Sequence, residues 1–215
     1  MAITRAEKKA SGGSKYMGFC EATLVEVKDR ISETTDDGSK KFPWADLYLE
    51  VTIQTKDSEY TRNMQICGSF DKDDSGKVKA DSATLKRLYW FLDAVGCQAG
   101  INADGGWEDE KGEPISDVVG LLNKYTIDST NGYYVYIYKE PDKKNPTKSW
   151  TRVHNKIVKN DTKGRADLES YINYMKTKGY LKEATDAIAN GVSDAKVVDS
   201  FSELDDMFSD DGMPA

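Results

Sequence analysis

Residues 133–159 read YYVYIYKEPDKKNPTKSWTRVHNKIVK, and this stretch predicts two β-strands joined by a basic loop. In an extended chain, successive side chains point to opposite faces of the sheet. One face of the first strand, residues 133–138, therefore carries only tyrosines: Tyr134, Tyr136 and Tyr138. The opposite face is more apolar and is the better candidate for the core: Tyr133, Val135 and Ile137. The three tyrosines of the first face are therefore expected to point outward or to lie at the rim. Residues 149–159 predict the partner strand.

Three further strands are expected before this hairpin. Alternating apolar residues predict them over residues 18–28, 45–55 and 60–70, and the last two form a hairpin around the turn at residues 56–59. The second strand has the clearest pattern, because its apolar residues share one face: Leu47, Leu49, Val51 and Ile53.

After residue 80 the spacing of the apolar residues changes from strand-like to helical. A helix is expected to begin with Asp81 or Ser82 as its N-cap and to end at Gly96. Its apolar residues are Leu85, Leu88, Leu92 and Val95. Residues 97–113 are rich in glycine and acidic residues and are expected to form a loop.

Helices are also expected after this loop and after the second hairpin. A short helix is predicted over residues 115–124, and a longer one over residues 165–178 that ends at Gly179. The apolar face of the longer helix consists of Leu168, Tyr171, Ile172 and Met175. One more short helix is expected around Leu181, Ala184 and Ile188.

The predicted order is therefore three strands, a helix, two strands and then helices, which indicates a mainly β protein with appended helices. This order resembles that of an OB-fold, a five-stranded Greek-key barrel with a helix between strands three and four. A β-sandwich or an α+β sheet gives the same order of elements, so these alternatives stay open.

The second hairpin carries the residues that are best suited to bind a ligand. Bases of single-stranded nucleic acid stack on aromatic rings for about 1–3 kcal/mol each, and lysine and arginine neutralise the phosphates. The loop of this hairpin corresponds to the loop between strands four and five, which is a usual ligand contact of OB-folds. The candidate nucleic-acid-binding residues are Tyr134, Tyr136, Tyr138, Lys139, Lys143, Lys144, Lys148, Trp150, Arg152 and Lys156.

The same residues have a simpler structural interpretation. Tyrosines can fill a β-core, and lysines can keep an edge hairpin soluble. Four residues nearer the N-terminus would extend a binding surface, although each alone is more often a packing residue: Trp44, Tyr48, Tyr60 and Arg62.

The net charge of −7 is distributed unevenly along the chain. Residues 139–182 hold 12 basic and 5 acidic side chains, whereas residues 17–138 hold 13 basic and 22 acidic ones. We expect any binding of nucleic acid to favour the C-terminal half of the body, because carboxylates repel phosphates. Three parts are predicted: a flexible basic arm (residues 1–16), an OB-like nucleic-acid-binding domain (17–184) and a disordered acidic tail (185–215).

The acidic tail contains apolar residues that a merely solubilising tail does not need. Apolar side chains spaced among carboxylates are typical of a segment that becomes ordered on a partner protein. The candidate partner-binding residues are Phe201, Leu204, Asp205, Asp206, Met207, Phe208, Asp210 and Asp211.

An OB-like β-rich body followed by such a tail resembles the single-stranded DNA-binding proteins of bacteriophages and bacteria. The resemblance implies sequence-tolerant binding of single-stranded DNA in replication, recombination or repair, with RNA as an alternative ligand. It also implies that the tail recruits replication or recombination proteins and competes with DNA, through positions matching Asp205 to Asp211 here. Tails of this family often end in an aromatic residue, whereas this chain ends in Gly212, Met213, Pro214 and Ala215.

Other classes of protein find little support in the sequence. No apolar run approaches the roughly 20 residues that span a bilayer, and three dispersed cysteines with one histidine match neither a zinc pattern nor a disulfide framework. An intracellular, cytoplasmic protein is expected, within the host cell if the protein is viral. Residues 71–76 copy the start of a calcium loop, but position twelve is Ser82 instead of glutamate.

We therefore expect a protein that is not an enzyme and that uses no cofactor or metal. A metal-dependent nuclease, built on the acidic residues of 108–113, is the weaker alternative. A second alternative is a non-catalytic structural or adaptor protein that binds other proteins through the tyrosine face.

Overall fold

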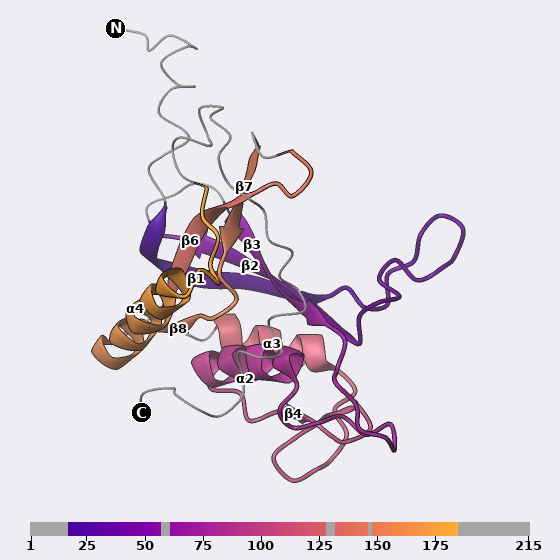
Figure 1. The fold of residues 1–215 in the computed structure, drawn as a ribbon. Coiled ribbons are helices and arrows are strands. Elements are labelled where there is room, and N and C mark those ends of the chain that lie inside the picture. The colour runs from indigo at the N-terminus through magenta and orange to yellow at the C-terminus, as the bar shows by residue number, and fades with distance from the viewer. Residues whose placement is uncertain (1–16, 57–60, 128–131, 146–147, 185–215) are drawn as a thin grey trace, which may run out of the picture. The chain divides into compact units, whose positions relative to one another are not determined.

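The computed structural model describes residues 17–56, 61–127, 132–145 and 148–184 (Figure 1). The basic arm and the acidic tail predicted from the sequence lie outside these residues. The described elements are β1 (Gly18–Asp29), β2 (Leu47–Thr55), β3 (Thr61–Gly68), α2 (Ala83–Val95), β4 (Gly100–Ile101), β5 (Trp107–Glu108), α3 (Val118–Ile127), β6 (Tyr133–Pro141), β7 (Ser149–Val153), β8 (Val158–Lys159) and α4 (Thr162–Thr177).

Six of these strands form one sheet, in the order β3-β2-β1-β6-β7, with β8 also paired to β6. Strand β6 returns through a long connection to lie antiparallel beside β1, with Gly18 opposite Ile137 and Ala22 opposite Tyr133. The order β6-β1-β2-β3 is that of a Greek key, in which the fourth strand lies beside the first. The predictions of a mainly β protein and of the order of its main elements are confirmed.

The expected barrel is not closed among the described residues, because β3 and β7 remain the two ends of the strand order. Two short strands share the second edge of β6. Strand β7 pairs with Ile137–Pro141, and β8 pairs with Tyr133 and Tyr134. The partner strand expected over residues 149–159 is therefore interrupted at 154–157, and pieces of five and two residues offer little edge to another strand.

The chain forms two compact units. Unit 1 contains the start of β1, the end of β2, the start of β3, and all of β6, β7, β8 and α4. Unit 2 contains the remaining parts of β1, β2 and β3, together with α2, β4, β5 and α3. No helix in the described ranges combines the length and the apolarity needed to cross a bilayer.

In unit 2 the predicted helix is confirmed as α2, with Ser82 as N-cap and Gly96 in the left-handed conformation (φ 76°) at its end. Its apolar stripe is buried, as expected from its spacing: Leu85, Leu88, Phe91, Leu92 and Val95. The expected loop over residues 97–113 instead contains the small β4–β5 hairpin. The Asn102 side chain stabilises this hairpin, because its Oδ1 accepts the backbone N–H groups of Asp104 and Gly106.

In unit 1 the longer predicted helix is confirmed as α4, which begins after the N-cap Asp161 and reaches Thr177. The Asp161 carboxylate accepts the backbone N–H of Gly164 at 2.7 Å, which satisfies one of the free donors of the first turn. Residues 181–184 are not helical, and the rest of the short helix expected near Ile188 lies outside the described residues. Helix α4 packs on β6 and β8, and this packing decides which face of the second hairpin is open.

Candidate nucleic-acid interface

The tyrosine face of β6 is largely covered. Tyr134 and Tyr136 are only 9% and 5% exposed, and they pack with Val158 and with two buried residues of α4, Leu168 and Ile172. The expectation that these two tyrosines face outward is therefore wrong. The reason is the apolar stripe of α4, which has to be buried, and the rings on this face of β6 supply the surface that buries it.

The hydroxyl groups of the covered tyrosines are held by charged residues of unit 1. Tyr134 donates to the Glu169 carboxylate at 3.1 Å. The Tyr136 hydroxyl donates to Glu183 and accepts from Lys176, whose ammonium lies 4.7 Å from the Tyr136 ring centroid. Burial is the main reason that the pKa of each phenol is raised. These tyrosines therefore form part of a polar seam under α4 and have no free ring face for a base.

The opposite face of β6 is buried in the core, as the sequence predicted. Val135 and Ile137 are fully buried, and Tyr133 is nearly so. The alternation of the strand therefore assigned the core side correctly.

The hairpin remains open beyond the covered tyrosines. Tyr138 lies opposite Arg152, and Glu140 lies opposite Trp150, so all four side chains lie on the same face of the β6–β7 pair. Trp150 is 53% exposed. Tyr138 is half-buried, and this burial raises its pKa to about 12. A flat indole ring and a guanidinium group thus occupy neighbouring positions on an accessible face.

The Trp150 ring is held in place by the turn of the hairpin. Its Nε1–H donates to Asp142 Oδ2 at 2.7 Å, while Asp142 Oδ1 accepts the backbone N–H groups of Lys144 and Asn145 at 2.7 and 2.9 Å. These hydrogen bonds hold the pKa of Asp142 below its ordinary value, and the bond from Trp150 has the largest effect. The carboxylate therefore shapes the turn and fixes the ring, and the charge of Lys148 makes only the smallest contribution to its lowered pKa.

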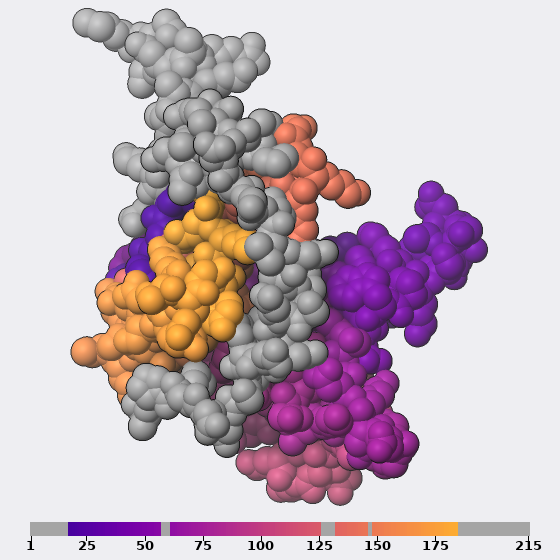
Figure 2. Space-filling model, viewed as in Figure 1, coloured from indigo at the N-terminus to yellow at the C-terminus, as the bar shows by residue number. Residues whose placement is uncertain are grey.

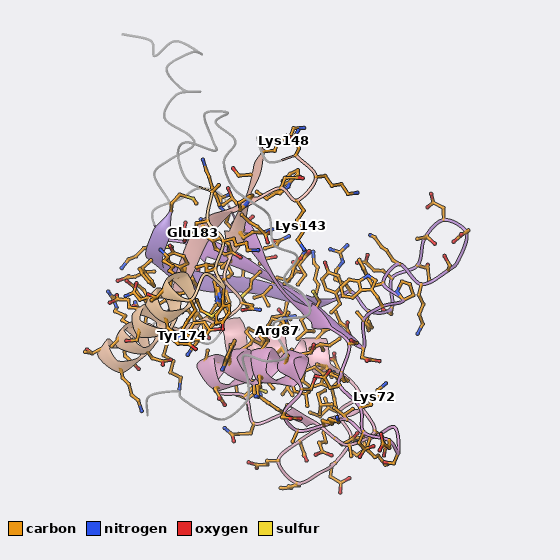
Figure 3. All side chains as sticks on the ribbon, viewed as in Figure 1. Lys72, Arg87, Lys143, Lys148, Tyr174 and Glu183 are labelled. Carbon is orange, nitrogen blue, oxygen red and sulfur yellow. The ribbon has the colours of Figure 1, made fainter. Side chains whose placement is uncertain are left out.

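The lysines of this hairpin stand mostly apart from carboxylates. In the part of the chain that the structure describes, no carboxylate lies within ion-pair distance of Lys139, Lys144 or Lys148. Lys143 and Lys148 are labelled on the hairpin in Figure 3. Arg152 does have a partner, because its Nε donates to Glu140 Oε2 at 2.8 Å, but both side chains are exposed. An exposed ion pair contributes little free energy, so the Arg152 guanidinium can exchange Glu140 for a phosphate at small cost.

Lys156 does not join the other predicted cations. Its side chain is largely buried, and its ammonium lies 3.0 Å from Asp167 of α4 and 4.5 Å from the Tyr171 ring centroid. The neighbouring His154 is also buried in this seam, between the rings of Tyr138 and Tyr171. Both residues therefore stabilise the contact of α4 with the strands.

Unit 2 contains a second group of rings and cations, which we name the Phe42 cluster. Phe42 lies 4.4 Å from the Tyr48 ring and 6.3 Å from the Trp44 ring, and Trp44 is 56% exposed. The Lys41 ammonium and the Arg30 guanidinium lie 5.5 and 5.9 Å from the Phe42 centroid. Trp44 and Tyr48 were predicted to extend a surface, whereas Phe42 was missed, although the run Lys40-Lys41-Phe42-Pro43-Trp44 already joins cations to rings.

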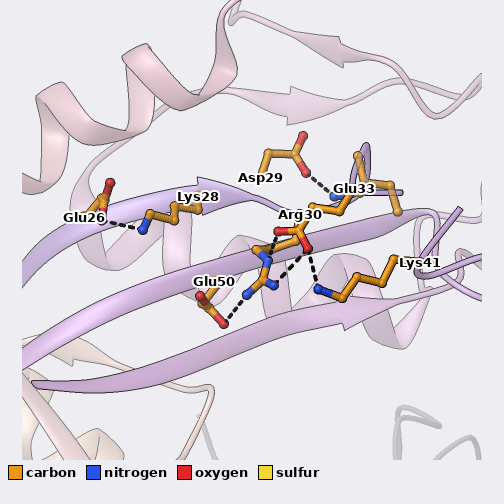
Figure 4. Close-up of polar contacts among 8 residues, drawn as sticks. Glu26, Lys28, Asp29, Arg30, Glu33, Lys41 and Glu50 are labelled. Atoms are coloured by element: carbon orange, nitrogen blue, oxygen red, sulfur yellow. Dashed lines mark hydrogen bonds and ion pairs between the residues drawn. The ribbon is translucent and has the colours of Figure 1, made fainter. Parts of the chain in front are cut away.

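The cations of the Phe42 cluster are already paired (Figure 4). Arg30 donates to Glu33 and to Glu50, the latter at 2.9 Å, and Lys41 donates to Glu33 at 2.9 Å. These two hydrogen bonds lower the pKa of Glu33 to about 2, and the bond from Arg30 has the larger effect. The cluster is therefore satisfied by its own carboxylates.

The acidic loops considered as metal sites are built as turns. Asp73 Oδ1 accepts the backbone N–H groups of Ser75 and Lys77, and Asp109 Oδ1 accepts those of Lys111 and Glu113. No group of three or more histidine, cysteine or carboxylate side chains is placed to hold a metal ion within the described ranges. Tyr60, the remaining aromatic residue predicted to extend the surface, lies outside those ranges, and its neighbour Arg62 is half-buried on β3.

The open end of the β6–β7 hairpin is thus the best candidate interface among the described residues. Comparison with known proteins adds no relative: no protein-family model, no curated protein and no solved structure matches this chain.

Proposed function

We propose that this protein binds single-stranded nucleic acid, DNA in the first place, without catalysis and with little sequence preference. The observation that carries the proposal is the exposed Trp150 ring, which Asp142 fixes beside Arg152 and near Lys139, Lys144 and Lys148, three lysines without an ion pair among the described residues. Such a ring stacks on any base, because every base has a π-face. The cations neutralise phosphates, whose charge does not depend on sequence.

The finer description of the fold as an OB-type fold is part of this proposal. It is supported by the Greek-key order of β6-β1-β2-β3 and by helix α2, which lies between β3 and β6 in the chain. In that fold the β6–β7 loop takes the place of the loop between strands four and five, which is a usual ligand contact.

Within the interface, we assign stacking to Trp150, with Tyr138 as a partly covered neighbour. Lys139, Lys143, Lys144 and Lys148 contact phosphates, together with Arg152 once a phosphate replaces Glu140. Tyr134, Tyr136 and Lys156 support the interface from beneath α4 and do not contact the ligand. The tail, with Phe201, Leu204 and Phe208, remains the proposed contact for replication or recombination proteins.

The alternative of an adaptor that binds proteins through the tyrosine face receives less support. That face would have to be accessible, and Tyr134 and Tyr136 are buried beneath α4. The exposed surface that remains on the hairpin is cationic, which suits phosphates better than an apolar protein surface.

Titration of a fluorescent oligonucleotide, in single-stranded and double-stranded form, tests the proposal. We expect saturable binding that prefers the single strand and weakens as salt increases. Trp150→Ala should reduce the affinity by about 1–3 kcal/mol, whereas Tyr125→Ala, which removes an exposed ring from α3 in unit 2, should have no effect. Absence of single-strand binding by the wild-type chain at low salt would refute the proposal.

A further inference from the structure

Two exposed tyrosines lie at the C-terminal end of α4, outside the interface described so far. Tyr174 and Tyr180 are 43% and 40% exposed, and their ring centroids are 6.4 Å apart at an angle of 56°. Figure 3 labels Tyr174 on α4. Neither residue belongs to the buried cluster beneath the helix.

The end of α4 holds the two rings together. Gly179 adopts the left-handed conformation (φ 73°), so the chain turns back on the helix. The backbone N–H groups of Gly179 and Tyr180 donate to the carbonyls of Lys176 and Met175 at 3.0 and 2.9 Å, which is the hydrogen-bond pattern of a Schellman motif. This motif usually closes with an apolar contact. Here both partners are aromatic, and each keeps about two-fifths of its surface exposed.

Lysines predominate among the charged residues around the pair. The segment 174–183 contains three lysines and one carboxylate, that of Glu183. Lys176 is engaged with Tyr136 and Glu183, whereas the exposed Lys178 places its ammonium 5.9 Å from the Tyr174 ring centroid. An accessible ring with a cation beside it is the same combination that makes the β6–β7 hairpin suited to nucleic acid.

The pair also lies on the same side of β6 as the hairpin interface. Lys176, two residues after Tyr174, reaches the Tyr136 ring, and Tyr136 is stacked against Tyr138 with centroids 6.2 Å apart. After Tyr180 the chain runs back along β6, where the Ala184 N–H donates to the Lys139 carbonyl at 2.7 Å. The orange and yellow residues of α4 and of this following segment lie at the molecular surface in Figure 2. Contacts within unit 1 therefore connect the hairpin with Lys176 and Ala184 at the end of α4, whereas Tyr174 lies on the other, exposed side of the same helix turn.

We propose that Tyr174 and Tyr180 form a second base-stacking site for the strand that is bound by the hairpin, with Lys178 contacting the adjacent phosphate. This inference rests on the proposed function and extends it to the path of the ligand. Only a strand long enough to reach from Trp150 to the end of α4 occupies both sites. The pair therefore determines how many nucleotides one molecule covers.

The test is a titration against a series of oligothymidylates of about 4 to about 16 nucleotides, the range that single OB-folds cover. The double variant Tyr174→Ala/Tyr180→Ala should bind the longest oligonucleotides at least about fivefold more weakly than the wild type, and the shortest ones equally well. Tyr174→Phe/Tyr180→Phe, which retains both rings, should restore wild-type affinity at every length. Tyr125→Ala serves as the surface control, and thermal unfolding of each variant verifies that the fold is intact.

The outcomes separate this inference from the function on which it rests. If Trp150→Ala weakens binding while the double alanine variant matches the wild type at every length, the second site does not exist and the proposed function stands. A loss that is equal at all lengths also overturns the inference, because the pair would then belong to the primary site. If the wild-type chain binds no oligonucleotide, the proposed function fails and this inference fails with it.

Discussion

The β6–β7 hairpin of unit 1 and the Phe42 cluster of unit 2 have the same ingredients, an exposed tryptophan and nearby cations. They differ in what the carboxylates do. In the Phe42 cluster Glu33 and Glu50 bind Arg30, and Glu33 also binds Lys41, so that the cations are already satisfied. In the hairpin the Asp142 carboxylate binds Trp150 and the turn backbone, and among the described residues no carboxylate lies within ion-pair distance of Lys139, Lys144 or Lys148. The comparison teaches that rings and cations suit a ligand better where the carboxylates nearby leave some of the cations without an ion pair.

Mild acid should produce the largest difference between the two units. Burial lowers the pKa of His154 from 6.5 to about 4, so between these values the unfolded chain binds a proton that the folded chain does not. Protonation of the buried imidazole is unfavourable, so the free energy of unfolding is highest above pH 6.5. It decreases by about 3 kcal/mol as the pH falls from 6.5 to 4. The pairs of the Phe42 cluster should persist in this range, because the pKa of Glu33 is about 2.

Hydrogen exchange on α4 and α2 between pH 7 and pH 4.5 measures this difference. Protection of α4 should decrease first, and His154→Gln should remove the pH dependence of α4 in this interval. Equal losses in both helices, or an unchanged pH dependence in the variant, would contradict the assignment to His154.

Charge reversal at the hairpin should have the next largest effect. Each phosphate contact on a single strand contributes a salt slope of about −0.7, so the loss of three contacts should weaken binding about a hundredfold at 0.1 M salt. Lys143→Glu/Lys144→Glu/Lys148→Glu should therefore bind every sequence more weakly and flatten the plot of log affinity against log salt. The matched variant in unit 2, Lys28→Glu/Lys40→Glu/Lys41→Glu, should change the affinity far less. A larger loss in the unit 2 variant would place the interface there.

The two exposed tryptophans allow a direct comparison of the rings. Trp150→Ala should weaken oligonucleotide binding by about 1–3 kcal/mol, because a stacked base loses its platform. Trp44→Ala removes a ring of nearly the same exposure, but the cations that lie on its neighbour Phe42, Lys41 and Arg30, are already paired with carboxylates, and we expect a loss of less than about 0.5 kcal/mol. Fluorescence anisotropy of one oligonucleotide with both variants is sufficient, and equal losses would extend the interface to the Phe42 cluster.

Deletion of residues 197–215 should have the smallest effect, and it should depend on the hairpin. The acidic tail is expected to compete with phosphates for the lysines of the hairpin through an attraction that salt screens over about 8 Å. The truncated chain should bind single strands severalfold more tightly at low salt and almost equally at high salt. In the triple hairpin variant the same deletion should change nothing; a gain of equal size there would show that the tail acts elsewhere.

Much of the secondary structure could be predicted because its signals are local. Alternation located β1, β2 and β3, and helical spacing between Ser82 and Gly96 located α2 almost to the residue. Other features depend on individual hydrogen bonds, which the spacing of apolar residues along the chain does not predict. The β4–β5 hairpin is stabilised by the Asn102 side chain, and the interruption between β7 and β8 begins after the His154 N–H has donated to the Tyr136 carbonyl of β6.

The residue types of the candidate site could be predicted from the sequence, but which of these side chains are accessible to a ligand could not. The sequence by itself determined that tyrosines alternate along one face of β6 and that lysines surround the following turn. Only the tertiary structure decided that α4 covers Tyr134 and Tyr136, that Lys156 is paired with Asp167, and that Trp150 stays open. The physical reason is that side-chain direction depends on neighbouring residues, whereas burial and ion pairing depend on apolar surfaces and carboxylates brought from distant positions in the chain.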